Sequence, residues 1–324
     1  MIGDVRGVLT CPVCGRGFDE GGPAAAAPGP SAAPPSAADP APAVLRCPAG
    51  HSFDIARQGY VNLLPGGARP GTADTAGMVA ARAAFLSAGH YAPLAGVVAG
   101  LAAASAAAPA PPAPGAGVSP GPSPAPGAAP CVLDAGAGTG YYLAAVLDRL
   151  RARPGYAGTS GLALDISARA LRHAARARPG IGAVVWDIWQ PLPVRDGAAA
   201  LVLNVFAPRN APEFRRVLRD GGALIVVTPG PGHLAELAGP AGLLAVDERK
   251  EERLAAALGA FFTPPEERGL TIALRLTRPQ AASLAGMGPA ARHAGAAGLR
   301  ERLAGLAEPI KITATFRISR YRPR

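Results

Sequence analysis

Three glycines at alternate positions, Gly136, Gly138 and Gly140, follow a short apolar run that ends in Asp134. Glycine permits sharp turns and leaves the main chain bare, so a ligand can approach the backbone there. A helical pattern begins at about residue 139 and extends to about 151. The stretch therefore predicts a strand, a tight turn and a helix, with a ligand bound beyond the carboxyl end of the strand.

The spacing of these glycines narrows the type of ligand. The dinucleotide fingerprint Gly-x-Gly-x-x-Gly fails here, because Tyr141 stands five residues after Gly136. Gly-x-Gly-x-Gly preceded by Asp resembles instead the first motif of class I S-adenosylmethionine-dependent methyltransferases. A glycine-rich turn in some other α/β protein is the alternative.

Two further acids end apolar runs, as expected for neighbouring strands. Asp165 ends GLALD, 25 residues after Gly140. A carboxylate at the end of the second strand can accept both hydroxyls of a nucleoside ribose. Asp187 follows a third apolar run, and its carboxylate could accept a hydrogen bond from the amino group of an adenine. Either acid could instead cap the helix or turn that follows it.

Four residues near the amino terminus have the types and spacing of a zinc site. Cys11 and Cys14 form a C-x2-C pair, and Cys47 and His51 a C-x3-H pair. A Cys3His set suits tetrahedral zinc, and with all four positions filled it predicts a structural ion. Each half begins with Cys-Pro and is followed by a phenylalanine, as in two matching knuckles around one ion. Four unrelated small residues are the alternative.

The charge of the chain indicates a polyanionic partner. The formal net charge is +10, and residues 275–324 hold ten Arg or Lys but only two acids. A basic surface attracts nucleic acid above all, although an arginine-rich proteome gives the same balance. No long apolar stretch predicts a membrane span, and no secretory signal is recognised, so we expect a cytoplasmic protein whose cysteines bind metal or are buried.

Two tracts of Ala, Pro, Gly and Ser, at 21–43 and 105–130, are predicted to be disordered linkers. They divide the chain into a zinc-binding domain at 1–64, a helical connection at 65–104 and a Rossmann-like domain at 131–324. Apolar strands alternate with helices in the last part, and two strands of period two follow. This predicts an α/β fold with a seven-stranded, doubly wound sheet and an antiparallel edge.

Several motifs in fixed order are more specific than this outline. CPVC, CPAGHSFDIARQGYVNLLP, ARAAFLSAGHYAPL, VLDAGAGTGYY, VFAP and TPGPGHLAEL follow one another along the chain. The series resembles the RlmA-type 23S rRNA (guanine-N1)-methyltransferases, including the tylosin-resistance enzymes of actinomycetes. The resemblance covers about 45–65, 75–94 and 131–240 and is weak beyond. The family has short connections in place of the two tracts, and its Gly-Cys-Gly-Glu core reads Gly-Ala-Gly-Thr here, which loses an acid.

The resemblance implies an amino-terminal zinc domain that recognises 23S rRNA and a Rossmann-like domain that binds S-adenosylmethionine. It implies no membrane partner, and a homodimer is one expected assembly. Tyr91, Gly138, Thr139 and His233 match the positions that line the cofactor in the family. The complete predicted cofactor site is Tyr91, Asp134, Gly136, Gly138, Thr139, Gly140, Asp165, Asp187 and His233.

The residues after the fourth strand indicate the atom that is methylated. Asn204, Phe206 and Pro208 face the predicted crevice and are the candidate substrate contacts, and the alternative for Phe206 is a core residue of the strand. Methylation of cytosine C5 needs a nucleophilic cysteine, and Cys131 lies before the glycine loop, away from this position. Exocyclic-amine methyltransferases carry Asn-Pro-Pro-Tyr here, where this chain has Asn-Val-Phe-Ala-Pro. A ring nitrogen such as guanine N1 therefore remains as the atom that is methylated. No residue is assigned as the general base.

Two other functions stay open at this point. One is a methyltransferase that acts on a small molecule or a protein and uses zinc only for folding. The other is a non-catalytic nucleic-acid-binding protein on a methyltransferase fold. Macrolide resistance of the tylosin type is implied by the resemblance alone.

Overall fold

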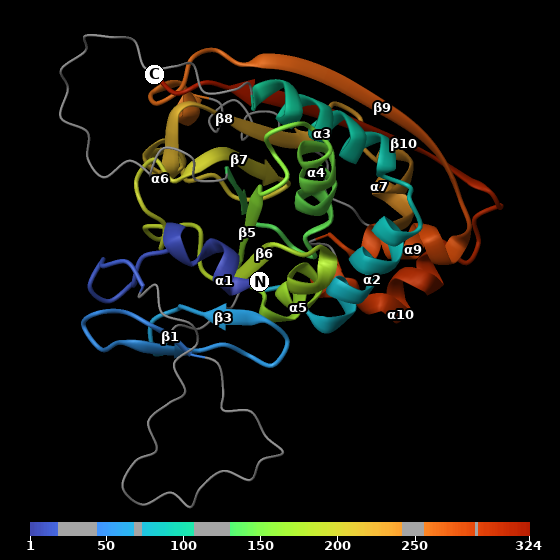
Figure 1. Cartoon of the computed structure of the whole chain (residues 1–324). Coiled ribbons are helices and arrows are strands. Elements are labelled where there is room, and N and C mark those ends of the chain that lie inside the picture. Colours follow the sequence, from blue (N-terminus) through green and yellow to red (C-terminus); the bar gives the residue numbers. More distant parts are fainter. Residues whose placement is uncertain (19–43, 68–72, 107–129, 242–255, 289–290) are drawn as a thin grey trace, which may run out of the picture.

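The computed structural model of the chain describes residues 1–18, 44–67, 73–106, 130–241, 256–288 and 291–324 (Figure 1). The predicted linker at 21–43 lies outside the described residues. So does the predicted linker at 105–130, apart from residues 105, 106 and 130.

The fold is organised around one eight-stranded sheet. In spatial order its strands are β3 (Tyr60–Asn62), β6 (Ile181–Val185), β5 (Ser160–Asp165), β4 (Cys131–Ala135), β7 (Ala199–Val205), β8 (Leu218–Pro229), β10 (Ile310–Tyr321) and β9 (Glu266–Leu276). The first six strands are parallel, and β10 is antiparallel to both of its neighbours. The strand order reverses at β4, and open α/β sheets bind ligands at such a switch point.

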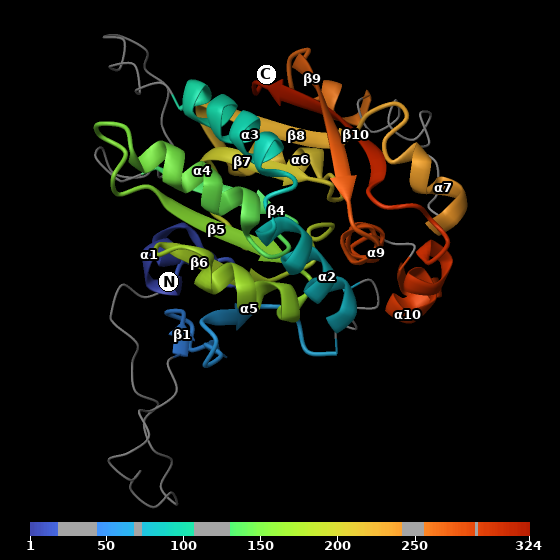
Figure 2. The ribbon, with the colours of Figure 1, turned by 90° about the vertical axis from the view of Figure 1, so that its right-hand side faces the viewer.

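Helices cover both faces of the sheet (Figures 1 and 2). One face carries α3 (Ala92–Ser105), α4 (Tyr141–Arg151) and α5 (Ala168–Ala177), and the other carries α1 (Ile2–Val5) and α6 (Ala211–Val217). Alternate strand residues enter the two resulting cores: Val132 packs in the first and Leu133 in the second, both with no exposed surface. This burial on both faces explains why the parallel strands read as continuous apolar runs.

A helical group stands beside the carboxyl ends of the strands. Helix α2 (Ala76–Ser87) is capped by Thr75, whose side chain accepts a hydrogen bond from the amide of Met78. It packs against α9 (Arg278–Gly286), which joins β9 to β10 together with α10 (Ala291–Leu303) (Figure 2). Helix α7 (Ala235–Ala241) follows β8 and contacts β10.

The amino-terminal residues are built into the sheet. They form the two-stranded pair β1 (Val44–Arg46) and β2 (Ser52–Asp54), the turn η1 (Arg6–Val8), and β3 at the edge of the large sheet. The seven predicted strands are all present with their antiparallel edge. The eighth, β3, is only three residues long, which is too short for its periodicity to show in the sequence.

Among the described residues, no single helix is long and apolar enough to span a membrane. The helices α2 and α3 reach the length and apolar composition of a membrane span only when they are taken together, and they are bent by 81° relative to one another.

The contact between α1 and β6 generates a stability prediction. A Cβ atom on Gly182 would lie 2.1 Å from Cγ2 of Val5, which is fully buried. We expect Gly182→Ala to lower the free energy of unfolding in urea by about 1–3 kcal/mol, since an overpacked core must shift to admit the methyl group. Gly269→Ala in β9 is the matched control, because no atom lies within 4 Å of its Cβ position. Equal stability of the two variants would contradict this packing.

Candidate cofactor and metal sites

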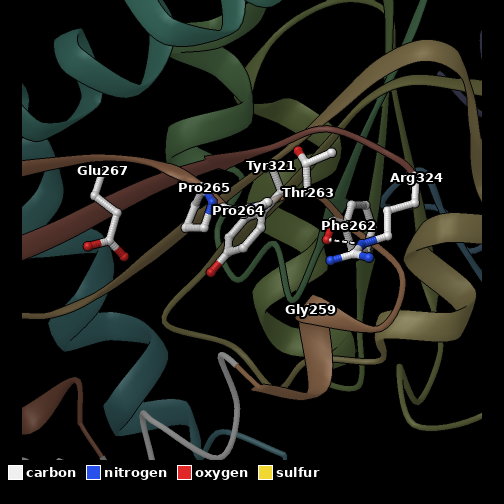
Figure 3. A pocket seen from close by; sticks show the side chains of 8 residues that line it. All are labelled: Gly259, Phe262, Thr263, Pro264, Pro265, Glu267, Tyr321 and Arg324. Atoms are coloured by element: carbon white, nitrogen blue, oxygen red, sulfur yellow. Dashed lines mark hydrogen bonds between the residues drawn. The ribbon is translucent and has the colours of Figure 1, made fainter.

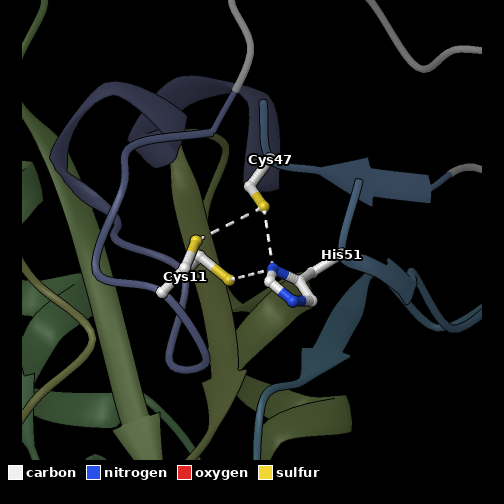
Figure 4. Close-up of side chains that lie close together, drawn as sticks. Cys11, Cys47 and His51 are labelled. Carbon is white, nitrogen blue, oxygen red and sulfur yellow. Dashed lines mark hydrogen bonds between the residues drawn. The ribbon is translucent and has the colours of Figure 1, made fainter. Parts of the chain in front are cut away.

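The four predicted zinc ligands converge. Each of Cys11, Cys14, Cys47 and His51 offers a ligand atom, and these atoms all lie within 4.8 Å of one another. The Cys14 and Cys47 sulfurs are 3.7 Å apart. Nδ1 of His51 lies 3.6 Å from Sγ of Cys11 and 3.3 Å from Sγ of Cys47 (Figure 4). Tetrahedral Zn–S and Zn–N bonds require about 3.8 Å between sulfurs and about 3.6 Å between sulfur and nitrogen. The residues therefore fit one zinc ion.

Both halves of this cluster have the same local structure. Gly15 and Gly50 adopt φ values of 72° and 86° and close a tight turn in each half. Left-handed backbone of this kind favours glycine. The two phenylalanines that follow the half-sites, Phe18 and Phe53, meet edge to face with ring centroids 5.9 Å apart. The repeated motif is thus a pair of knuckles that pack on one another.

The electrostatics of the cluster also favour a metal. Burial acts to raise the pKa of the Cys47 thiol, but hydrogen bonds from His51 and from backbone amides outweigh it and lower the pKa to about 7. Burial raises the pKa of Cys11. A cation between the sulfurs would stabilise both thiolates.

The glycine loop has the predicted strand–turn–helix form. Gly136, Gly138 and Gly140 have φ values of 88°, 54° and 77°. A Cβ on Gly136 would lie 2.3 Å from Cβ of Ala207, and one on Gly140 would lie 2.9 Å from Ala174 in α5. These two glycines are therefore required for packing, while Gly138 keeps the loop backbone open.

Asp165 fixes this loop. Its Oδ2 accepts a hydrogen bond of 2.8 Å from the Gly138 amide, and its Oδ1 accepts one of 2.8 Å from the Ser167 amide. Burial raises its pKa, and these amides counteract the increase. Ser167 caps α5 through its own hydroxyl. Asp165 therefore joins the loop to α5, and each carboxylate oxygen still has a second lone pair for a ligand hydroxyl.

Asp134 lies inside the sheet with 1% of its surface exposed. Burial, and then the charge of Asp165, raises the pKa of Asp134 to about 8. Its Oδ1 has no hydrogen-bond partner among the described residues. Thr139 of the glycine loop is also buried. Asp187 accepts a hydrogen bond of 3.0 Å from the amide of Trp189 and so caps a turn after β6.

The candidate substrate residues differ from one another in role. Asn204 is fully buried and donates hydrogen bonds to the carbonyls of Ala135 (3.0 Å) and Pro208 (2.8 Å), so it joins β7 to the end of β4. Phe206 follows β7, is 43% exposed and has φ of 54°. A positive φ in a non-glycine residue stores strain, which is concentrated at functional sites. Its exposure excludes the alternative that it is a core residue of the strand.

An aromatic group lies beside Phe206. Phe316 of β10 contacts Phe206, Tyr91 and His233 with centroid distances of 5.8, 5.1 and 5.0 Å. Tyr91 is buried, its hydroxyl has no partner among the described residues, and burial raises its pKa. Burial lowers the pKa of His233, and its Nδ1 lies 2.6 Å from the Thr315 carbonyl, which leaves Nε2 as the acceptor of the neutral ring.

Sequence reasoning missed two residues of this region. Phe316 lies in an edge strand far along the chain, and only the antiparallel register of β10 with β8 brings it to Phe206. Arg82 reads as a surface charge on α2, yet its Nη1 lies 3.4 Å from the Cβ position of Gly138. Neither residue has a local motif that could have identified it.

A hollow lies at the opposite end of the sheet (Figure 3). It is lined by Phe262, Pro264, Pro265, Tyr321 and other residues. Strand β10 runs from Phe316, paired with Pro229 at the carboxyl end of β8, towards Tyr321, which pairs with Leu224, whereas the glycine loop follows the carboxyl end of β4. The hollow is therefore separate from the candidate cofactor site.

Comparisons with known proteins identify the family. A family model described as "RlmA, N-terminal", a zinc ribbon, matches residues 39–69. A protein of Micromonospora griseorubida named as a 23S rRNA (guanine-N1)-methyltransferase is 50% identical over 323 residues, 100% of both chains. The 23S rRNA (guanine(748)-N1)-methyltransferase of Streptomyces fradiae is 45% identical over 86% of this chain and 91% of its own. The chain belongs to this family.

Membership in the 23S rRNA (guanine-N1)-methyltransferases confirms the predicted resemblance. It also extends it, because both relatives align far beyond residue 240 and the match includes the carboxyl strands. Among solved structures, a type II methyltransferase from Anaeromyxobacter dehalogenans is 19% identical over 60% of this chain and 90% of its own, with a TM-score of 0.41.

The cluster geometry predicts one zinc ion per chain. Cys47→Ser removes a thiolate, so we expect the purified variant to lose most of its zinc and the amino-terminal residues to become sensitive to protease. Metal analysis and limited proteolysis measure both effects. Cys131→Ser in β4 is the control, because it changes a buried cysteine outside the cluster and should keep the metal. Less than about 0.3 zinc per wild-type chain would contradict a structural ion.

The raised pKa of Asp134 predicts a pH dependence of stability. The unfolded chain ionises this carboxyl near its ordinary pKa of 3.8, whereas the folded protein keeps its proton up to about pH 8. The free energy of unfolding should therefore fall between about pH 4 and 8, by at most about 1.4 kcal/mol per pH unit. Asp134→Asn should remove this part of the slope, measured in the absence of ligand. Asp196→Asn, with an exposed carboxyl, should keep it, and an unchanged slope in Asp134→Asn would refute the assignment.

Proposed function

We propose that this protein transfers a methyl group from S-adenosylmethionine to N1 of a guanine in 23S rRNA. The observation that carries the proposal is 50% identity over the full length of a relative named for that activity. The two sites described above support it independently. One is a glycine loop at the switch point of a doubly wound sheet, and the other is a zinc cluster joined to the same sheet.

The residues around the loop fit the cofactor. S-adenosylmethionine supplies an electrophilic methyl group on its sulfonium. Gly138 leaves the main chain accessible, and Asp165 would accept the ribose hydroxyls through its free lone pairs. Asp187 would face the adenine. Tyr91, Asp134 and Thr139 present polar groups in the same buried region, and two of these groups lack a partner among the described residues.

The substrate end of the site would hold a guanine that has left its base stack. Enzymes that modify bases commonly flip them into a pocket, and sequence-specific RNA recognition favours loops. The strained, exposed Phe206 would stack on this base, and the hydrogen bond from Asn204 to the carbonyl of Pro208 would hold the loop after β7 in shape. The name of the Streptomyces fradiae relative specifies guanine 748. We propose the corresponding guanine, in a hairpin loop of domain II.

The rest of the assignment follows from this substrate. The zinc domain would grip the hairpin while the basic surface contacts phosphates. An rRNA substrate supports a cytoplasmic location, and a homodimer is the proposed assembly. We retain domain limits of 1–64, 65–104 and 131–324, with β3 shared between the zinc domain and the sheet.

Reverse transcription of rRNA tests the proposal. N1-methylguanine cannot form a Watson–Crick pair, so we expect a stop one nucleotide before the modified guanine in RNA from the native host. The stop should vanish in a strain that lacks the gene and return when wild-type protein is restored. Restoration with Gly138→Val is the control, because a side chain at this position would obstruct the loop and raise local strain.

A stop that persists in the deletion strain would refute the rRNA assignment. A methyltransferase of small molecules or proteins would then become the better reading, provided that the purified protein binds S-adenosylmethionine in calorimetry. Failure to bind the cofactor would leave a non-catalytic nucleic-acid-binding protein.

A further inference from the structure

Arg82 is the guanidinium that reaches the glycine loop from outside the Rossmann-like domain. A Cβ atom on Gly138 would lie 3.4 Å from Nη1 and 3.7 Å from Cδ of Arg82. Gly138 belongs to the loop after β4, whereas Arg82 belongs to α2, more than fifty residues earlier. The side chain of Arg82 therefore lies against the one glycine of the loop that does not pack on protein backbone or on an alanine.

Two contacts hold this guanidinium in place. Its Nη1 forms an ion pair with Asp74, and its Nη2 donates a hydrogen bond of 3.0 Å to the carbonyl of Met287, after α9. The Arg82 and Asp74 side chains are 24% and 18% exposed. An arginine carries five N–H donors in a fixed fork, so these two contacts orient the group without exhausting it.

Acidic side chains lie near Arg82, and some of the polar groups in the same region have no hydrogen-bond partner among the described residues. Asp134 and Asp165 lie in the same buried region, and the charge of Arg82 opposes the rise in the pKa of Asp165 and Tyr142. The hydroxyls of Tyr91 and Tyr142 have no hydrogen-bond partner among the described residues. A ligand with a negative group would be repelled by the carboxylates of Asp74 and Asp165 unless it met Arg82.

S-adenosylmethionine has such a group. Its adenosine end is neutral, its sulfonium is positive, and its amino-acid end carries a carboxylate. The aspartates suit the ribose hydroxyls and the positive groups, and they do not suit the carboxylate. We propose that Arg82 binds the α-carboxylate of the cofactor and thereby positions the sulfonium at the glycine loop. This inference rests on the proposed function.

The opposing reading is that Arg82 only braces α2 against α9 through Met287. Two ligands separate the readings. S-adenosylhomocysteine contains the amino-acid end, and 5′-methylthioadenosine keeps the adenosine and the sulfur but lacks the carboxylate. A brace would affect both ligands alike, whereas a carboxylate contact affects only the first.

Calorimetry of both ligands with the full chain measures the difference. We expect Arg82→Met to weaken S-adenosylhomocysteine about 10–100-fold, as expected for loss of a charge-assisted hydrogen bond, and to change 5′-methylthioadenosine less than about twofold. Arg82→Lys keeps the charge without the fork and should give an intermediate loss. The matched control is Arg178→Met, which breaks an exposed Arg–Asp pair with Asp148 and should change neither ligand.

Equal weakening of the two ligands by Arg82→Met would overturn the inference in favour of the brace, and so would unchanged binding of both. If Arg82→Met does not fold, Arg82→Lys decides by the same ratio of the two affinities. Wild-type protein that binds neither ligand would overturn the proposed function itself, and the inference with it.

Discussion

The candidate cofactor site depends on one carboxylate that accepts two backbone hydrogen bonds. Asp165 binds the amide of Gly138 through one oxygen and the amide of Ser167 through the other. These bonds join the end of β5, the turn after β4 and the start of α5. Because Gly138 and Gly140 have positive φ, the turn costs more conformational entropy than an ordinary loop, and Asp165 offsets part of that cost. The shape of the loop is thus fixed before any ligand arrives.

The carboxyl groups of Asp134 and Asp165 are difficult to keep ionised together in this region. Asp134 is buried and Asp165 is partly buried, and the charge of Asp165 adds to burial in raising the pKa of Asp134. Arg82 and the loop amides compensate for part of this, and a cofactor with a sulfonium and an ammonium would compensate for more. Binding and the protonation of these carboxyls are therefore linked properties of one site.

The sequence predicted most of the fold because its signals were local. The strand that contains Asp134, the glycine turn and each half of the Cys3His set are contained in a few neighbouring residues, and the structure has the strand and the turn and brings the two halves together. Phe316 and Arg82 could not be predicted in this way, because their roles arise from the register of β10 and the docking of α2. The cofactor and substrate roles of individual residues stay predictions. The structural role of Asn204 could not be read from the sequence either. Its buried side-chain amide donates hydrogen bonds to the carbonyls of Ala135 and Pro208, which are far apart in the chain.

The short strand β3 has a consequence for how the protein is made. An exposed sheet edge invites pairing with other chains, and β3 covers the outer edge of β6. Val61 is synthesised 123 residues before its partner Val184, so β3 is already present when β6 leaves the ribosome and can cover the new edge at once. All four zinc ligands precede β3 in the sequence, so the metal site is complete before β6 is made. Loss of the ion would therefore disturb the strand that covers the β6 edge, apart from any part the ion plays in recognising RNA.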